Sequence, residues 1–350
     1  MMKFLFFVTV VILGVANATA DKEKHKDHNE AEHKALCNLL KAAVTKWGDS
    51  GETLSDPLKK ALGKTIFGEG AKQDLSVLRE GMPVVYMDVL KVPGSRSVAC
   101  GQRYNDAGGE LSGILEEQPR WSGHSAPHDL VCLCTAGSHG WPVNESSQKD
   151  RLCGKDRGAL KAEGSKGWGG MNAGYAVQWS EQIQATWENV TKECLNADGQ
   201  SYNLKDFIEK FKEKLGPEQH DVMKRPRRQL GQGQPDRYGA CDGSEKQGVC
   251  VMYYESAGHT PWWVDLEKAL IEDENLQKQR EEEAKKRQKE LEQKQELPKT
   301  EASKSAPPTN NQTERHQNNN ITDTIRKFNL TSGTLITTPC SWLISAILLI

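Results

Sequence analysis

The densest group of possible metal ligands is a pair of cysteines with three histidines nearby in the sequence. Cys132 and Cys134 flank one leucine, and the histidines are His124, His128 and His139. Thiolate and imidazole are common ligands of Zn²⁺, so these residues could be drawn as a zinc site. The two ends of the chain, described below, predict a secreted protein that keeps eight of its nine cysteines. In such a chain, disulfides explain the two cysteines with fewer assumptions. We therefore expect disulfides here, with no metal and no cofactor.

Catalytic motifs are poorly represented. His28 and His33 enclose two glutamates, but their spacing is wrong for two metal ligands on adjacent helical turns. Residues 123–127 read Gly-His-Ser-Ala-Pro and lack the second glycine of a nucleophile elbow. The glycine-rich stretch 164–174 has neither the dinucleotide-binding pattern nor a phosphate-binding Gly-Lys-Ser/Thr, which indicates a surface loop. The sequence therefore predicts a protein that is not an enzyme, and a secreted hydrolase is disfavoured.

Three histidines lie near the amino terminus, at His25, His28 and His33, among lysines and acidic residues. Such surroundings favour a solvated helix face over a set of metal ligands.

The end of the chain carries a short apolar tail. Residues 329–340 are small, polar or mildly apolar, and residues 341–350 are apolar without a charge. A membrane-spanning helix needs about 20 apolar residues, so this tail is too short to span a bilayer. The pattern is typical of a tail that is replaced by a glycosylphosphatidylinositol (GPI) lipid. We expect residues 333–350 to be removed and the lipid to be attached within residues 329–333, with Ser332 preferred.

The amino terminus predicts secretion. A basic start is followed by an apolar run from Phe4 to Val15 and by small residues at Ala18 and Ala20. This is the pattern of a signal peptide, residues 1–20, which would be cleaved before Asp21. The two terminal segments together predict a chain on the extracellular face of the plasma membrane, held in the outer leaflet by its lipid anchor.

Nine cysteines are present, and Cys340 falls in the tail that we expect to be removed. The remaining eight suit four disulfides in an oxidising compartment, and the sequence does not choose among their pairings. A bond between Cys37 and Cys194 is a guess, because both lie on apolar helix stripes. The disulfide candidates are Cys37, Cys100, Cys132, Cys134, Cys153, Cys194, Cys241 and Cys250.

Sequons and charge describe the surface of the chain. The formal net charge of −2 gives no reason to expect nucleic-acid binding. Five Asn-x-Ser/Thr sequons in the expected mature chain permit glycosylation, at Asn144, Asn189, Asn311, Asn320 and Asn329.

Apolar periodicity predicts a mainly α-helical domain over residues 21–265. We place its end near Asp265 because every tryptophan but the one in the tail lies before that residue. The helices expected from apolar stripes and end signals lie at residues 36–47, 56–67, 172–194 and 204–215, with another turn at 74–79. Short strands and loops are expected at residues 83–87 and 93–150, which contain many Gly, Pro and Ser. The basic cluster 224–228 is expected in a polar surface loop, with a processing site or heparin-type patch as alternatives.

The remainder of the mature chain is hydrophilic. Residues 266–297 predict a charged helix with favourable i,i+4 pairs and few apolar a/d positions, which favours a solvated single helix over a coiled coil. Residues 298–332 are polar and contain Pro307-Pro308 and an Asn/Gln run, which predicts a disordered hydrophilic tether.

The chain resembles a variant surface glycoprotein of African trypanosomes. The residues that carry the likeness are Cys37 on the first helix, the segment 131–135, the helix 172–194 and the anchor signal. The resemblance implies an elongated helical bundle built on two long antiparallel helices, with disulfide-tied irregular lobes and a few short strands. No cysteine lies between Cys250 and Cys340, so the chain is similar to the short-tailed type that lacks a cysteine-rich C-terminal domain.

The resemblance also implies a function. Such proteins are homodimers that pack as a dense coat, and switching of the exposed coat mediates antigenic variation and evasion of host antibodies. The partners expected are therefore a second copy, neighbouring coat molecules and host antibodies. The alternative is a GPI-anchored helical receptor for a host protein such as haptoglobin-haemoglobin or transferrin, because the same bundle serves both roles.

Overall fold

The computed structural model describes residues 26–90, 95–101, 120–144, 150–163, 166–170, 176–197, 203–222, 224–237, 239–254 and 260–295. The chain divides into two units, residues 1–290 and 291–350. In the second unit the described residues are 291–295, which continue the last helix. The signal peptide, the tether, the anchor signal, His25, Asn311, Asn320, Asn329, Ser332 and Cys340 lie outside the described residues.

The first unit is mainly α-helical, as expected. Its helices are α1 (Glu30–Trp47), α2 (Asp56–Phe67), α3 (Leu75–Glu80), α4 (Arg96–Ala99), α6 (Ala126–Cys134), α7 (Ala176–Thr186), α8 (Lys192–Leu195), α9 (Leu204–Lys212) and α10 (Trp262–Gln295). Among the described residues there are also two 3₁₀ segments, η1 (Val84–Leu90) and η2 (Ser138–Gly140), and a π-helical turn, η5 (Trp187–Thr191).

The strands are few and short. A parallel pair joins β1 (Asp27–His28) to β2 (Arg151–Leu152). An antiparallel sheet of order β3-β4-β5 contains β3 (Gln219–His220), β4 (Pro226–Gly233) and β5 (Gly248–Tyr254). Every residue of β5 is buried, so this strand forms part of the core rather than a solvated edge.

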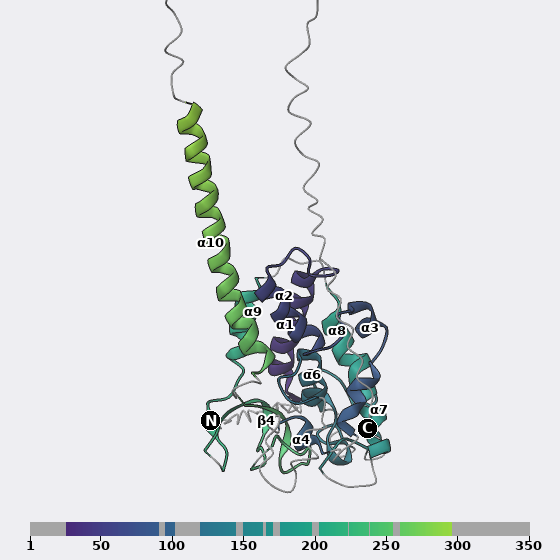
Figure 1. The fold of residues 1–350 in the computed structure, drawn as a ribbon. Coiled ribbons are helices and arrows are strands. Elements are labelled where there is room, and N and C mark those ends of the chain that lie inside the picture. Colours follow the sequence, from purple (N-terminus) through teal and green to yellow (C-terminus); the bar gives the residue numbers. More distant parts are fainter. Residues whose placement is uncertain are drawn as a thin grey trace, which may run out of the picture. The chain divides into compact units, whose positions relative to one another are not determined.

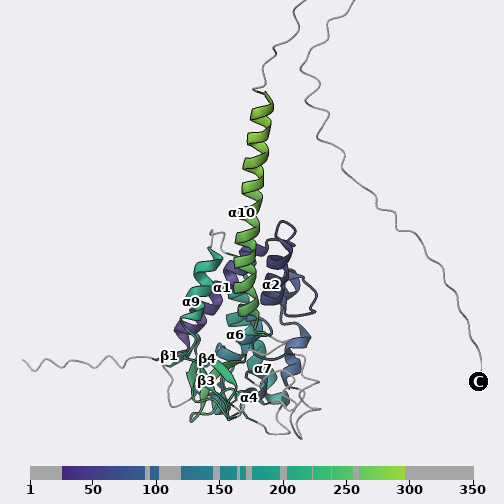
Figure 2. The same ribbon diagram turned by 60° about the vertical axis from the view of Figure 1, so that its left-hand side comes forward.

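Helix α6 lies at the centre of the packing. It contacts α1, α2, the α7–η5 segment and strand β5, and all nine of its residues are buried. Figures 1 and 2 show α1, α2 and α9 above α6 in the view, and the strands of the sheet below it. Asn29, which caps α1, donates hydrogen bonds from Nδ2 to the carbonyls of Leu133 and Val249. The first helix is thereby joined to both α6 and β5.

Helix α10 changes character along its length. Its first turns bury Trp262, Leu266 and Ala269 in the core, whereas the residues from 278 to 293 are all exposed. Lys212 and Lys205 of α9 pair with Glu267 and Glu274 of α10. Helix α10 (Figure 1) therefore begins before residue 266, where the charged helix is expected to begin, and its first turns pack in the core.

Several local expectations are wrong. Residues 84–90 form a 3₁₀ helix rather than a strand, and α4 and α6 replace part of the strands and loops expected at 93–150. The basic cluster 224–228 leads into strand β4 instead of lying in a polar loop. In contrast, the helix expected at 172–194 is present over 176–195, where α7, the π-helical turn η5 and α8 follow one another without a break. The two long antiparallel helices of the expected bundle are not confirmed.

Candidate functional site

Four disulfides connect the eight cysteines of the core. Cys37–Cys194 joins α1 to α8, Cys100–Cys132 joins the end of α4 to α6, Cys134–Cys153 joins α6 to the turn after β2, and Cys241–Cys250 ties a loop to β5. The prediction of four disulfides is confirmed, and the guessed bond between Cys37 and Cys194 is formed. Two of the four bonds fix the central helix α6.

The zinc site that could be drawn at Cys132 and Cys134 is replaced by this bonding. The two cysteines enter different disulfides, so neither offers a thiolate. His128 donates a hydrogen bond from Nε2 to the carbonyl of Ala99 at 3.0 Å, and His139 is exposed on η2. The Nδ1 atom of His124 accepts a hydrogen bond from Arg120 at 3.3 Å. The sequence neighbours therefore serve separate structural contacts.

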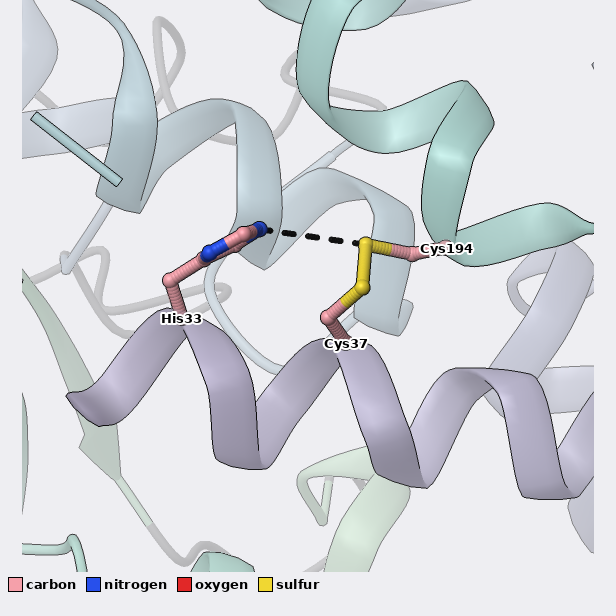
Figure 3. Close-up of side chains that lie close together, drawn as sticks. All are labelled: His33, Cys37 and Cys194. Carbon is pink, nitrogen blue, oxygen red and sulfur yellow. Dashed lines mark hydrogen bonds between the residues drawn. A yellow bond between two sulfur atoms is a disulfide. The ribbon is translucent and has the colours of Figure 1, made fainter. Parts of the chain in front are cut away.

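His28 and His33, the two described histidines near the amino terminus, are not on a solvated face. His28 lies in β1, is 6% exposed and packs edge-on against Trp141 with ring centroids 5.2 Å apart. His33 is half-buried on α1, with its Nε2 atom 3.9 Å from the Sγ atom of Cys194 (Figure 3). Burial lowers the pKa of His33 to about 4. Charged neighbours in the sequence were a poor guide, because Trp141 packs against the ring of His28 and Cys194 of α8 lies beside that of His33.

Asp129 is an ionisable residue buried in the core. It is fully buried on α6, and its carboxylate accepts hydrogen bonds from the backbone N–H of Gly123 at 2.9 Å, the hydroxyl of Tyr253 at 2.9 Å and Nε1 of Trp262 at 2.7 Å. Burial raises the pKa of Asp129 to about 7, although the three donors oppose that shift. The carboxylate thus joins α6 to strand β5 and to the start of α10.

Arg96 stabilises the opposite end of α6. Its guanidinium is fully buried and donates hydrogen bonds to the carbonyls of Cys132, Thr135 and Trp168. A cation is favourable here because the last carbonyls of a helix carry partial negative charge. Burial lowers the pKa of Arg96 to about 9, so the group stays charged at neutral pH. Helix α6 is thereby held at both ends by buried ionisable side chains.

Ser125 does not form a nucleophile. Its Oγ accepts a hydrogen bond from the backbone N–H of His128 and so caps the start of α6. It also lies 3.4 Å from the hydroxyl of Tyr86. The nearby imidazole of His128 points instead to the carbonyl of Ala99. Around α6, the serine, histidine and acidic side chains therefore stabilise the fold. The sequence did not predict this group, because the only local sign of the helix is the Ser-x-Pro at its start.

The basic cluster is also used in folding. Arg225 forms an ion pair with Asp221, and Arg227 donates hydrogen bonds to the carbonyl of Asp236 and to the hydroxyl of Tyr254. Arg227 is 8% exposed. A cavity of about 70 Å³ beside it is lined by Glu218, Pro226, Arg227, Arg228, Tyr253 and Trp263. Ligand pockets usually measure about 300–1,000 Å³, so this cavity is too small for one.

His128 is one of several buried histidines that make the fold sensitive to acid, with His33 among the others. Burial lowers the pKa of His128 to about 3, so the unfolded chain, with an ordinary pKa near 6.5, binds the extra proton first. Stability from this residue is complete above about pH 6.5 and is lost on acidification toward pH 3, at about 1.4 kcal/mol per pH unit. We expect His128→Gln to flatten this slope by about one proton near pH 5 and by less than half a proton at pH 7, measured by urea unfolding over that range.

Two details sharpen this test. Asp129 contributes with the opposite sign, because its raised pKa makes stability fall as the pH rises toward 7. Comparing His128→Gln with the parent chain cancels that contribution. The control is the same pair of proteins above about pH 8, where the imidazole is neutral in both states and the two slopes should agree. An unaltered slope in His128→Gln would contradict the assignment.

The two sequons within the described residues differ in their surroundings. Asn144 lies in a half-buried bend, whereas Asn189 is inside η5 and donates a hydrogen bond from Nδ2 to the carbonyl of Ala159 at 2.8 Å. Thr191 of the same sequon is fully buried. A glycan on Nδ2 of Asn189 would have to displace the segment around Ala159.

We therefore expect the folded, secreted chain to carry no glycan at Asn189. The measurement is glycopeptide mass spectrometry of the purified protein, with Asn189→Gln migrating on a gel like the parent chain. Because Asn189→Gln removes a partly buried hydrogen bond, its free energy of unfolding should fall by about 1 kcal/mol. A glycan found at Asn189 of the folded protein would refute the prediction.

Among the described residues, no helix has both the length and the apolar character needed to cross a bilayer. Comparison with known proteins identifies one family: a family model described as the trypanosomal VSG domain matches residues 40–293. The match includes most of the disulfide-bonded core, beginning within α1 after Cys37, and most of α10. No curated protein and no solved structure matches the chain.

Proposed function

The chain belongs to the trypanosomal variant surface glycoprotein (VSG) family, and on this premise we propose that it is a GPI-anchored coat glycoprotein of a trypanosome surface. The single observation that carries the proposal is the family match over residues 40–293. The family consists of structural surface coat proteins rather than enzymes. We further propose that the protein forms a dense protective layer on the outer face of the plasma membrane and takes part in antigenic variation and immune evasion.

The chemistry of the core supports a structural role. The buried ionisable groups on and beside α6, including Asp129 and Arg96, bond to the fold around them. A coat protein has to survive outside the cell, where a small apolar core benefits from covalent cross-links. The four disulfides meet that requirement without implying any reaction.

The exposed part of α10 supports a spacer role. Its residues from 278 to 293 are all exposed and mostly charged, so they gain little from packing. A hydrophilic helix of this kind would separate the disulfide-bonded core from a lipid attached after the tether. We propose attachment at Ser332, after removal of residues 333–350.

The anchor is tested by enzymatic release. Membranes from cells that express the full chain are treated with a phosphatidylinositol-specific phospholipase C, and released protein is measured by immunoblot. We expect the chain to move into the soluble fraction, as a known GPI-anchored control does. A variant that lacks residues 333–350 should be secreted without treatment. Retention of the parent chain on membranes that release the control would refute the anchor.

We propose a homodimer because members of the family form homodimers. Sedimentation equilibrium of the released protein tests this, and the mass of a monomer would refute it. A receptor for a host protein is not favoured over a coat protein, because the family match points to the coat.

A further inference from the structure

We propose that opening of the Cys37–Cys194 disulfide by a dithiol reductant creates a binding site for a thiophilic divalent cation, Zn²⁺ or Cd²⁺, with His33, Cys37 and Cys194 as its ligands. The disulfide and the metal would be alternative links between α1 and α8. This inference does not depend on the coat function.

The three side chains already converge on one point. His33 and Cys37 lie one turn apart on α1, and Cys194 comes from α8 (Figure 3). Their ligand atoms all lie within 4.8 Å of one another, and the Nε2 atom of His33 is 3.9 Å from the Sγ atom of Cys194. Side chains one helical turn apart share a face, so the helix itself keeps His33 and Cys37 together.

The geometry needs only a small change at the sulfurs. Tetrahedral zinc has Zn–S bonds of about 2.3 Å and Zn–N bonds of about 2.0 Å, which places its sulfurs about 3.8 Å apart and N and S about 3.5 Å apart. The nitrogen–sulfur distance is close to this value already. The two sulfurs, which are covalently bonded in the structure, must separate once the bond is broken. With the Cα atoms 4.9 Å apart, rotation of the cysteine side chains can open this gap without moving the helices far.

The protonation state of His33 suits a metal ligand. Burial lowers the pKa of its imidazole to about 4, so the ring is neutral at pH 7 and has a lone pair for the metal. The positive charges of Lys34, Lys41 and Lys155 lower the pKa of the ring further, whereas the negative charge of Glu193 raises it. Lys155 is itself paired with Glu193 at 2.6 Å. Two thiolates would neutralise the dication, so the lysines are compatible with a bound metal.

The reaction balances in two steps. The dithiol gives two electrons and two protons to the disulfide, becomes a disulfide itself and leaves two protein thiols. The divalent cation then displaces one proton from each thiol and binds both thiolates and the imidazole, with water in the fourth position. Binding keeps α1 attached to α8 after the covalent link has gone. Reoxidation to the disulfide would require release of the metal.

The test uses the secreted chain, reduced with dithiothreitol, desalted without oxygen and titrated with Co²⁺ as a spectroscopic stand-in for Zn²⁺. We expect a thiolate-to-cobalt charge-transfer band in the reduced chain that is absent from the oxidised chain. In His33→Ala the affinity of this site should fall at least about tenfold. In His220→Ala, which alters an exposed histidine away from the disulfides, it should be unchanged.

Location is checked by alkylation of the reduced chain with and without Zn²⁺, followed by peptide mapping. We expect Zn²⁺ to protect Cys37 and Cys194, and to protect them less in His33→Ala. Equal affinity and protection in His33→Ala and the parent chain would overturn the proposal, because they would show a simple dithiol. Protection confined to other cysteines, or a reduced chain that unfolds and shows no protection at Cys37 and Cys194, would also overturn it.

Discussion

Replacing Cys37 and Cys194 together with serine is expected to lower the free energy of unfolding by about 3–5 kcal/mol, the largest loss among the four cross-links. The two cysteines are 157 residues apart in the sequence, farther than the residues of any other disulfide in the core. Loop-closure entropy alone gives about 5 kcal/mol for a loop of this length. The actual loss will be smaller, because two other disulfides lie inside this loop and already shorten the unfolded chain.

The matched control is Cys241→Ser with Cys250→Ser. The two cysteines of this bond are separated by only 9 positions in the sequence. For a loop of that length the same entropy relation gives about 2.6 kcal/mol. Both double variants place hydroxyls at buried positions, since Cys194, Cys241 and Cys250 are fully buried. Guanidinium unfolding at pH 7 compares the two free energies directly. Equal losses in the two variants would contradict a stabilisation that grows with loop length.

The sequence predicted those helices whose apolar residues occupy one face. In α1, Leu36, Leu40 and Ala43 are buried and the opposite side is solvated, and Gly48 follows the last residue. In α2, Pro57 lies in the first turn and Gly68 follows the end. In these elements local propensity and burial agree, so periodicity alone located them to within a few residues.

The central helix escaped the same reasoning because it has no solvated face. All of α6 is buried, and its polar residues, His128 and Asp129, are buried with the apolar ones. A helix that is covered on every side lacks the 3.6-residue alternation on which pattern arguments rest. The bonds that make Asp129 tolerable come from Tyr253 and Trp262, more than 120 residues away. Contacts at such separations cannot be inferred from local spacing.

The candidate site was predictable in composition but not in arrangement. The eight core cysteines and their oxidation follow from the expected secretion of the chain, and the fold then determines which of them meet. The prediction of a polar loop at residues 224–228, where β4 begins, was wrong for a related reason. The arginines there suggested a surface loop, but the guanidinium of Arg227 has carbonyl and hydroxyl acceptors in the core. A basic residue can be buried when the tertiary structure supplies its partners.

Removing the carboxylate of Asp129 is expected to be almost as damaging as losing the longest disulfide. Asp129→Ala leaves three buried donors without an acceptor: Gly123 N–H, the Tyr253 hydroxyl and the Trp262 indole N–H. An unsatisfied buried donor costs about 1–3 kcal/mol, so the total loss should be at least about 3 kcal/mol, measured by urea unfolding. Tyr253→Phe, which removes one donor and keeps the carboxylate bonded to the other two, should cost only about 1 kcal/mol.

The pH dependence distinguishes the carboxylate from a merely space-filling side chain. Burial raises the pKa of Asp129 to about 7, above its unfolded value near 3.9, so the folded chain holds this proton more tightly. The associated stability is fully present below about pH 4 and is lost as the pH rises through 7. The loss caused by Asp129→Ala should therefore be larger at pH 5 than at pH 8, whereas that of Tyr253→Phe should change less. A loss independent of pH would show that the buried carboxyl is ionised over this whole range, and that the three donors outweigh its burial.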